Sequence, residues 1–269
     1  MSFLDLDFMQ RGLLAAGLVG LVAPAIGVFI VQRRLSLLGD GIGHVAVAGV
    51  GLGFLTGSSP LVTALAAAVV GAVVIELIRE RGKAAGDVAL ALLFYGGIAG
   101  GVFLASLSSN GGSLFSYLFG SVLTVSRSDV AVIGGLSLVV VVVLAVLGKH
   151  LFAVAYDEEV ARAAGIRTRG LNIALAVIAA VTVVVGMRVV GLLLVAALMV
   201  IPVATAQAVS RSFRGTVVTS LLVGILSSLA GVVAAYYLDA FPGATIVLTA
   251  LAVFVLASAL SKVRTRVGA

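Results

Sequence analysis

A carboxylate and an imidazole stand out in the apolar run of residues 38–45, Leu-Gly-Asp-Gly-Ile-Gly-His-Val. Asp40 and His44 are four residues apart, so a helix would place both side chains on one face, about one turn from each other. Carboxylate oxygens and imidazole nitrogens are suitable ligands for zinc, manganese or iron, and the absence of cysteine excludes thiolate ligands. One pair offers two ligands, and two copies of the chain meeting on a twofold axis would offer four. Asp40 and His44 are therefore candidate metal ligands.

The same two residues also have a structural interpretation, which the sequence leaves open. Asp40 could cap the N-terminus of a helix, and His44 could form a hydrogen bond with a neighbouring backbone group. Ionisable side chains within a membrane are costly and usually mark a transport pathway. The choice therefore depends on the elements that carry the two residues.

The composition predicts that those elements are membrane-spanning helices. Of the 269 residues, 62% are hydrophobic and 10% charged, whereas a soluble domain has about a quarter charged residues. Apolar runs of nearly 20 residues follow one another, and each is long enough as a helix to cross about 30 Å of hydrocarbon. We predict an all-α, polytopic transmembrane helical bundle that forms one domain over residues 1–269. The best estimate is nine spans, at residues 12–31, 36–57, 61–78, 88–107, 130–147, 170–187, 189–208, 216–237 and 245–261.

The segment 108–127 leaves the number of spans between eight and ten. It is polar at first and then aromatic, as in an interfacial or re-entrant helix.

Basic residues predict the orientation, because cytoplasmic loops are enriched in Lys and Arg. The connections at 32–35, 79–87, 148–169 and 209–215 and the tail after 261 carry fourteen basic residues, whereas the other side has only Arg11, Arg127 and Arg188. This places the chain in the cell membrane with its N-terminus outside and its C-terminus in the cytoplasm.

Positions inside the spans follow from this orientation. If the second span is helical from about Arg34, Asp40 lies about 9 Å and His44 about 15 Å along its axis, near the midplane. Glu76 is one turn from Arg79 and is expected to reach the cytoplasmic interface.

Small residues recur at a spacing that lets helix backbones approach closely. Gly49, Gly53 and Gly57 repeat every four residues, as do Gly97 and Gly101. We interpret them as sites of ordinary helix packing.

The longest predicted cytoplasmic connection, 148–169, contains the signals of a short helix. It has an acidic start at Asp157 and a glycine stop at Gly165. Val160, Ala161 and Ala164 would lie on one side, as small apolar positions open to a partner. A linker helix that packs on its own bundle is the alternative.

The chain has no P-loop, because no lysine follows the required G-x-x-x-x-G spacing. We expect that it is not an enzyme and hydrolyses no nucleotide by itself. Its net charge of +6 comes from basic residues dispersed among loops, so no nucleic-acid partner is expected.

Several segments together resemble the zinc/manganese permeases of ABC importers. They are residues 8–11 and 33–40 followed by His44, the run 191–206, the run 228–245, and the loop 157–165. The likeness covers most of the chain, in order. One departure is the Gly-Ile-Gly at 41–43, where the family usually has small residues and a Ser directly before the His; the spacing of Asp40 and His44 is preserved.

The resemblance implies a membrane-spanning permease subunit with partners. Two copies would form the pathway, with separate ATPase subunits on the cytoplasmic side and an extracytoplasmic metal-binding protein above. Asp40 and His44 would bind the transported zinc or manganese, with no permanently bound cofactor. The pathway would work by alternating access, opening in turn to the outside and to the cytoplasm. The ATPase-coupling helix would contain four residues of the cytoplasmic loop: Asp157, Glu158, Ala161 and Gly165.

Three other classes remain open at this point. A permease for a siderophore or vitamin would not need the Asp–His pair, and an ion-gradient-driven secondary transporter would not need the coupling helix. A structural membrane scaffold would tolerate substitution of both Asp40 and His44.

Overall fold

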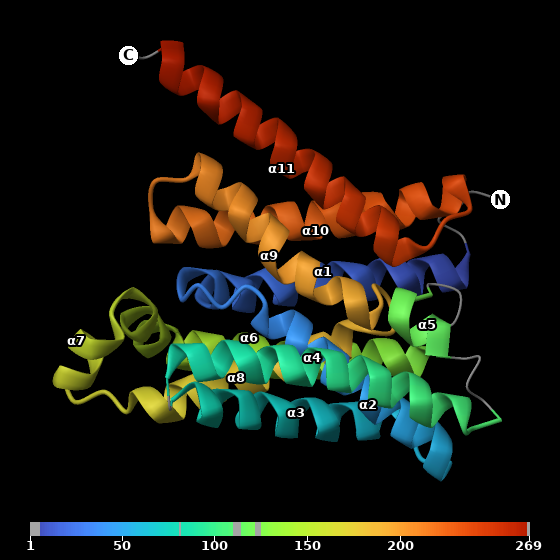
Figure 1. Ribbon diagram of the computed structural model, residues 1–269. Coiled ribbons are helices and arrows are strands. Elements are labelled where there is room, and N and C mark those ends of the chain that lie inside the picture. Colours follow the sequence, from blue (N-terminus) through green and yellow to red (C-terminus); the bar gives the residue numbers. More distant parts are fainter. Residues whose placement is uncertain (1–5, 81, 110–113, 122–124, 268–269) are drawn as a thin grey trace.

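The computed structural model describes residues 6–80, 82–109, 114–121 and 125–267, which form eleven helices and contain no strand. Most of the helices lie side by side along one common direction, whereas α11 leaves the bundle obliquely (Figure 1). The elements are α1 (Asp7–Gln32), α2 (Leu38–Thr56), α3 (Pro60–Arg79), α4 (Lys83–Ser106), α5 (Leu114–Phe119), α6 (Arg127–Tyr156), α7 (Glu158–Ala163), α8 (Thr168–Gly186), α9 (Leu192–Val209), α10 (Phe213–Leu238) and α11 (Pro242–Val267).

All nine predicted spans are helices, so the polytopic all-α fold is confirmed. Eight of the described helices are long and apolar enough to cross a membrane, and the ninth predicted span is α9, whose apolar part is the shorter Leu194–Val209. Helix α5 has six residues, about 9 Å of helix, so the described part of the segment 108–127 adds no span. Residues 110–113 and 122–124 of that segment lie outside the described residues.

Local signals fix the start of α6, and the helix then runs past its predicted end. The Ser126 hydroxyl accepts a bond from the Asp129 backbone N–H at 3.1 Å, and the Asp129 carboxylate accepts one from the Ser126 N–H at 3.0 Å. Helix α6 continues to Tyr156, so its length of about 45 Å exceeds the thickness of the hydrocarbon. The predicted connection 148–169 therefore shortens to 157–167, and Lys149 and His150 lie in the last turns of α6.

Helix α2 lies inside the bundle, where it packs against α3, α4, α8 and α9. Glycines allow its closest contacts, because a Cβ on Gly97 of α4 would lie 2.5 Å from the carbonyl oxygen of His44, and one on Gly49 would lie 2.6 Å from a backbone atom of α3. Gly57 differs from the other glycines of the repeat. It ends α2 in the left-handed conformation at φ 65°, and a Cβ there would meet no described atom within 4 Å.

The connections gather at two ends of the bundle. Helix α7 and the α1–α2, α3–α4 and α9–α10 connections lie towards the left in Figure 1, whereas α5 and the α2–α3 and α10–α11 connections lie towards the right. We call the first the basic end, because it carries the ion-paired side chains of Arg33, Arg79, Arg162 and Arg169, and the second the opposite end. Of the fourteen basic residues predicted on the cytoplasmic side, five have side chains that lie outside those the structure describes: Arg81, Lys83, Lys262, Arg264 and Arg266.

Candidate functional site

Asp40 and His44 lie in the first two turns of α2. The helix begins at Leu38 and not near Arg34, because the chain turns between α1 and α2 and Arg34 has a left-handed φ of 59°. Along the axis, Asp40 is therefore about 3 Å and His44 about 9 Å from the first residue of α2. The continuous helix from Arg34 that placed His44 near the midplane is wrong.

The two side chains share one face of α2, as their spacing predicts. Oδ1 of Asp40 lies 3.8 Å from Nε2 of His44, which is longer than a hydrogen bond. The Asp40 side chain is 34% exposed and that of His44 is 6% exposed. The pair thus combines a half-buried carboxylate with a buried imidazole.

The surroundings of His44 do not complete its hydrogen bonding. The ring of Phe94 on α4 covers the imidazole, with the ring centroids 3.7 Å apart. Nδ1 of His44 is buried and finds no hydrogen-bond partner in the described part of the chain, an arrangement that costs about 1–3 kcal/mol. The backbone hydrogen bond that a structural histidine would need is therefore not found there.

Asp40 is not the cap of α2. The N-cap is Leu37, which makes no capping bond with its side chain, and Asp40 is the third residue of the helix. A carboxylate in the first turn is favourable next to the helix dipole, but Asp40 does not occupy the N-cap position that the structural interpretation assigned to it. Both parts of the structural interpretation thus lose their support.

One chain offers too few ligands for a complete metal site around this pair. Over the ranges that the structure describes, no group of three or more His, Asp or Glu side chains could hold a metal ion. An ion at Asp40 and His44 would therefore need ligands other than the His, Asp and Glu side chains of the described residues.

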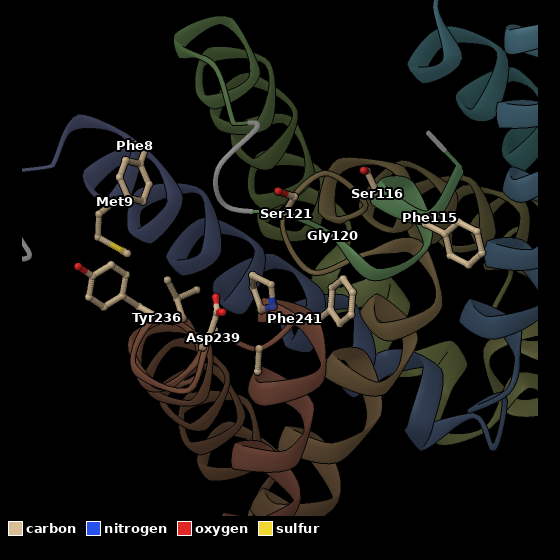
Figure 2. Close-up of a pocket in the computed structure, with 13 residues that line it drawn as sticks. Phe8, Met9, Phe115, Ser116, Gly120, Ser121, Tyr236, Asp239 and Phe241 are labelled. Carbon is tan, nitrogen blue, oxygen red and sulfur yellow. The ribbon is translucent and has the colours of Figure 1, made fainter. Parts of the chain in front are cut away.

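Two cavities lie at the two ends of the bundle. The first, of about 490 Å³, is at the opposite end between α1, α5, α10 and the start of α11 (Figure 2). Its lining includes Asp239, which ends α10 with a left-handed φ of 50°. The second, of about 470 Å³, is at the basic end and is lined in part by Arg33 and Glu158. Neither of these two cavities is lined by Asp40 or His44.

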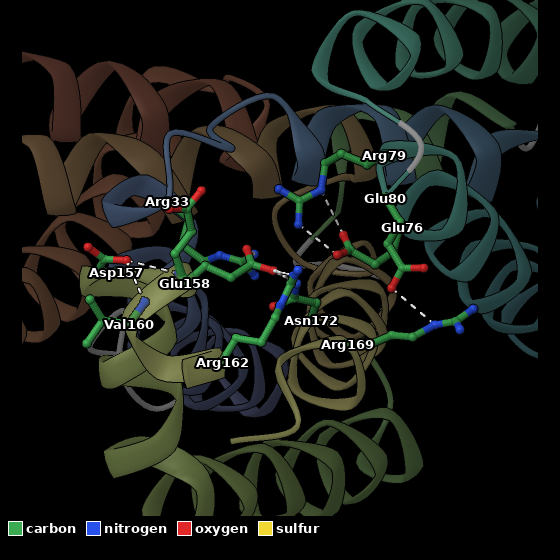
Figure 3. A network of polar contacts seen from close by, with 11 residues as sticks. Arg33, Glu76, Arg79, Glu80, Asp157, Glu158, Val160, Arg162, Arg169 and Asn172 are labelled. Atoms are coloured by element: carbon green, nitrogen blue, oxygen red, sulfur yellow. Dashed lines mark hydrogen bonds and ion pairs between the residues drawn. The ribbon is translucent and has the colours of Figure 1, made fainter. Parts of the chain in front are cut away.

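Glu158 of α7 holds three neighbours at the basic end (Figure 3). Its Oε2 accepts a hydrogen bond from Nη2 of Arg33 at 3.1 Å. Its Oε1 accepts one from Nδ2 of Asn172 on α8 at 3.1 Å and one from Nη2 of Arg162 at 3.3 Å. Burial lowers the pKa of Arg33, the nearby Arg79 lowers it further, and Glu158 acts in the opposite direction.

Glu76 of α3 is buried, contrary to the expectation that it reaches the interface. It is 1% exposed, and its two oxygens accept hydrogen bonds from Nε and Nη2 of Arg79 at 3.0 and 2.7 Å. Arg79, with its side chain 22% exposed, is the member of the pair that extends towards the surface. A second pair, Glu80 with Arg169 at 3.1 Å, joins α3 to the start of α8.

Helix α7 is the short helix predicted in the connection, but its two faces are assigned differently. Oδ1 of Asp157 accepts hydrogen bonds from two backbone N–H groups of the first turn, and Gly165 ends the segment with a left-handed φ of 81°. Ala161 is 3% exposed and packs on the bundle, whereas Val160 is 64% exposed. The prediction that Val160, Ala161 and Ala164 form one accessible face is therefore wrong for Ala161.

Three residues of these sites were missed by sequence reasoning. Phe94 contacts His44 from α4, whereas Glu158 is contacted by Arg33, directly after α1, and by Asn172 on the next helix, α8. In the sequence, Arg33 counts among the basic residues of the 32–35 connection and begins the run 33–40 of the resemblance, but neither pattern predicts its burial next to Glu158. No local pattern distinguishes Phe94 or Asn172 from other residues of their helices.

Comparison with known proteins adds independent evidence. Residues 5–261 match the ABC 3 transport family. The chain is 30% identical over 250 residues to the manganese import system permease protein ScaB of Streptococcus gordonii, covering 93% of this chain and 90% of that protein. It is 31% identical over 263 residues to a probable iron transport system membrane protein of Haemophilus influenzae, covering 98% and 97%. A chain in the solved structure of PsaBC from Streptococcus pneumoniae in complex with Fab superposes with a TM-score of 0.86 at 29% identity, covering 94% and 92%.

Proposed function

The chain belongs to the ABC 3 transport family, and from that premise we propose that it is the membrane-spanning permease of an ATP-driven importer of divalent transition-metal ions. Relatives named for manganese and for iron transport match nearly its full length, which supports a metal ion as the substrate. Since the chain lacks a P-loop, separate ATPase subunits would hydrolyse the nucleotide. An extracytoplasmic binding protein would deliver the ion.

The observation that carries the metal site is the incomplete pairing of Asp40 with His44. Oδ1 of Asp40 faces Nε2 of His44 at 3.8 Å, too far for a hydrogen bond. A metal ion would supply the interaction that the two groups do not make with each other. Oxygen and nitrogen donors without thiolate suit manganese or zinc and keep the site exchangeable.

We propose that two copies of the chain face each other and contribute four donors to one ion. Manganese is the first ion to test, because a permease named for manganese import is similar over 93% of this chain. The site must bind weakly enough to release the ion, so the four donors would hold it only while the pathway switches between outward and inward openings.

The basic end is proposed to face the cytoplasm, following the distribution of Lys and Arg. Helix α7 would then dock on the ATPase through its exposed side, which includes Val160. The cavity bordered by Asp239 would open outside the cell, where the binding protein releases the ion.

The test compares the two histidines of the chain in cells that lack it. Metal content after growth in limiting manganese should be restored by the wild type and by His150→Ala, because His150 is exposed on α6, but not by His44→Ala. Asp40→Asn should behave as His44→Ala does, and Asp7→Asn, at an exposed carboxylate, as the wild type does. Full restoration by His44→Ala with Asp40→Asn would reject the site. Restored uptake of zinc or iron but not of manganese would reassign the ion.

A further inference from the structure

The inward face of α7 is held to the bundle by a single carboxylate with several partners. Glu158 and Ala161 are three residues apart on that face, and Ala161 is 3% exposed. Val160, on the other side, is 64% exposed. The helix therefore presents one face to solvent, while Glu158 fastens the other.

Glu158 connects three separate elements. Oε2 binds the end of α1 through Arg33, and Oε1 binds α8 through Asn172 and α7 itself through Arg162 (Figure 3). The Arg33 side chain is 7% exposed and that of Glu158 is 34% exposed, so the guanidinium is buried, whereas the carboxylate borders the cavity at the basic end. Hydrogen bonds between charged groups are stronger than neutral ones, and the buried guanidinium fixes one end of this bond.

Arg33 leads directly into the helix that carries the candidate metal ligands. Its own N–H bonds to the carbonyl of Phe29, and the N–H groups of Arg34 and Leu35 bond to carbonyls of the last turn of α1, at 2.9 Å each. The N–H of Leu38, the first residue of α2, bonds to the carbonyl of Leu35 at 2.9 Å. The chain between Arg33 and α2 is thus a hydrogen-bonded turn and not a slack linker.

We propose that Glu158 is a positioning residue that transmits movement of α7 through Arg33 to the start of α2, and so to Asp40 and His44. This proposal rests on the proposed function, because it assumes that an ATPase moves α7. Its bond to Asn172 would carry the same movement into α8, which packs against α2. Glu158 therefore acts towards the bundle, and the exposed side of α7 is left for the partner.

The test uses the absence of native cysteine. A single reporter label is placed on Tyr156→Cys, directly before α7 (the label on α7), or on Leu37→Cys at the start of α2, where the native residues are 77% and 68% exposed. The complete transporter, with its ATPase subunits, is reconstituted in nanodiscs, and the label signal is recorded before and after a non-hydrolysable ATP analogue is added. We expect both labels to respond in the otherwise unchanged protein.

With Glu158→Gln, the label on α7 should keep its response to the nucleotide analogue. The response of the label at Leu37→Cys should fall about fivefold or more, which is the lower end of typical coupling between two sites. Manganese ions transported per ATP hydrolysed should fall by a similar factor in proteoliposomes. The control is Asp7→Asn, at an exposed carboxylate on α1, outside the proposed docking face, which should change neither signal. Arg33→Lys should retain part of the coupling, whereas Arg33→Gln should lose it, and the double variant with Glu158→Gln should be no worse than either.

The possible outcomes separate the two proposals. An unchanged response at Leu37→Cys in Glu158→Gln and in Arg33→Gln would overturn the positioning role, as would a label on α7 that never responds to nucleotide. If Glu158→Gln does not fold, the comparison of Arg33→Lys with Arg33→Gln decides the question. Failure of the unsubstituted transporter to accumulate manganese, zinc or iron would instead reject the proposed function.

Discussion

Replacing Gly97 of α4 with alanine tests whether close packing of α4 on α2 positions the candidate metal site. The added Cβ would lie 2.5 Å from the carbonyl oxygen and 2.6 Å from the carbonyl carbon of His44. Ordinary contact begins roughly 0.9 Å farther out, near 3.4 Å. The contacted atoms belong to the backbone of a helix, so they cannot move aside by rotating a side chain. Helix α4 must therefore shift, or α2 must bend at the residue that supplies the imidazole.

The size of the effect follows from this overlap. Overpacking of this kind costs typically about 1–3 kcal/mol, which lowers the thermal stability of the protein without unfolding it. A displacement near 0.9 Å also exceeds the roughly 0.5 Å within which a binding constellation must be held. We expect Gly97→Ala to insert in the membrane and to lower manganese accumulation about tenfold.

The matched control is one residue away. A Cβ on Gly96 would meet no described atom within 4 Å, so Gly96→Ala should keep full uptake and gain up to about 1 kcal/mol from the better helix propensity of alanine. Both variants are measured by metal content of complemented cells and by thermal unfolding of the purified protein. Wild-type uptake by Gly97→Ala, or equal damage by Gly96→Ala, would refute the packing argument.

Two further predictions concern the buried ion pair at the basic end and the orientation of the chain. Glu76→Ala should destabilise the protein by about 3 kcal/mol, because it leaves Arg79 unpaired in a largely buried position. Glu80→Ala should cost less than about 1 kcal/mol, because its partner Arg169 is exposed. Equal losses of stability in thermal unfolding would contradict the assignment of Glu76 as buried. In intact cells, a membrane-impermeant maleimide should label Phe241→Cys, whose native side chain is 61% exposed at the opposite end, and should label Val160→Cys only after permeabilisation. The reverse pattern would invert the proposed orientation.

The spans could be predicted from the sequence because hydropathy reports a bulk property of each segment. Runs of apolar residues decide that a helix forms and is long enough, and single substitutions hardly change that sum. The prediction that Asp40 and His44 share one face of a helix is also confirmed, since the i, i+4 relation depends only on helix geometry. These successes share one cause, which is that the signal is local.

The failures all concern the partner of a side chain or the exact course of a turn. The start of α2 was missed because Arg34 adopts a left-handed conformation, which few residues other than glycine adopt and which no pattern announces. Glu76 was placed at the surface because a neighbouring arginine fits a solvated pair as well as a buried one. Ala161 was assigned to the outer face because α7 has only six residues, too few for a period to define which side is apolar. A backbone turn at Arg34 and the burial of Glu76 and Ala161 in the bundle decided these cases, and no local pattern shows either.

Asp40 and His44 differ from the other ionisable pairs in the described residues near the basic end. Arg33 with Glu158 and Arg79 with Glu76 are joined at 3.1 Å and 2.7 Å, and each carboxylate has all its main neighbours within hydrogen-bond distance. Folding alone would favour the same closure for Asp40 and His44, because a buried polar group without a partner is costly and rare. Oδ1 of Asp40 and Nε2 of His44 nevertheless remain 3.8 Å apart. Arg188 with Asp129, at 3.6 Å, is also left open, and the buried hydroxyls of Ser137, Ser227 and Ser228 also find no partner in the described part of the chain. What distinguishes Asp40 and His44 is therefore their chemistry, because a carboxylate and an imidazole can together bind an imported divalent cation.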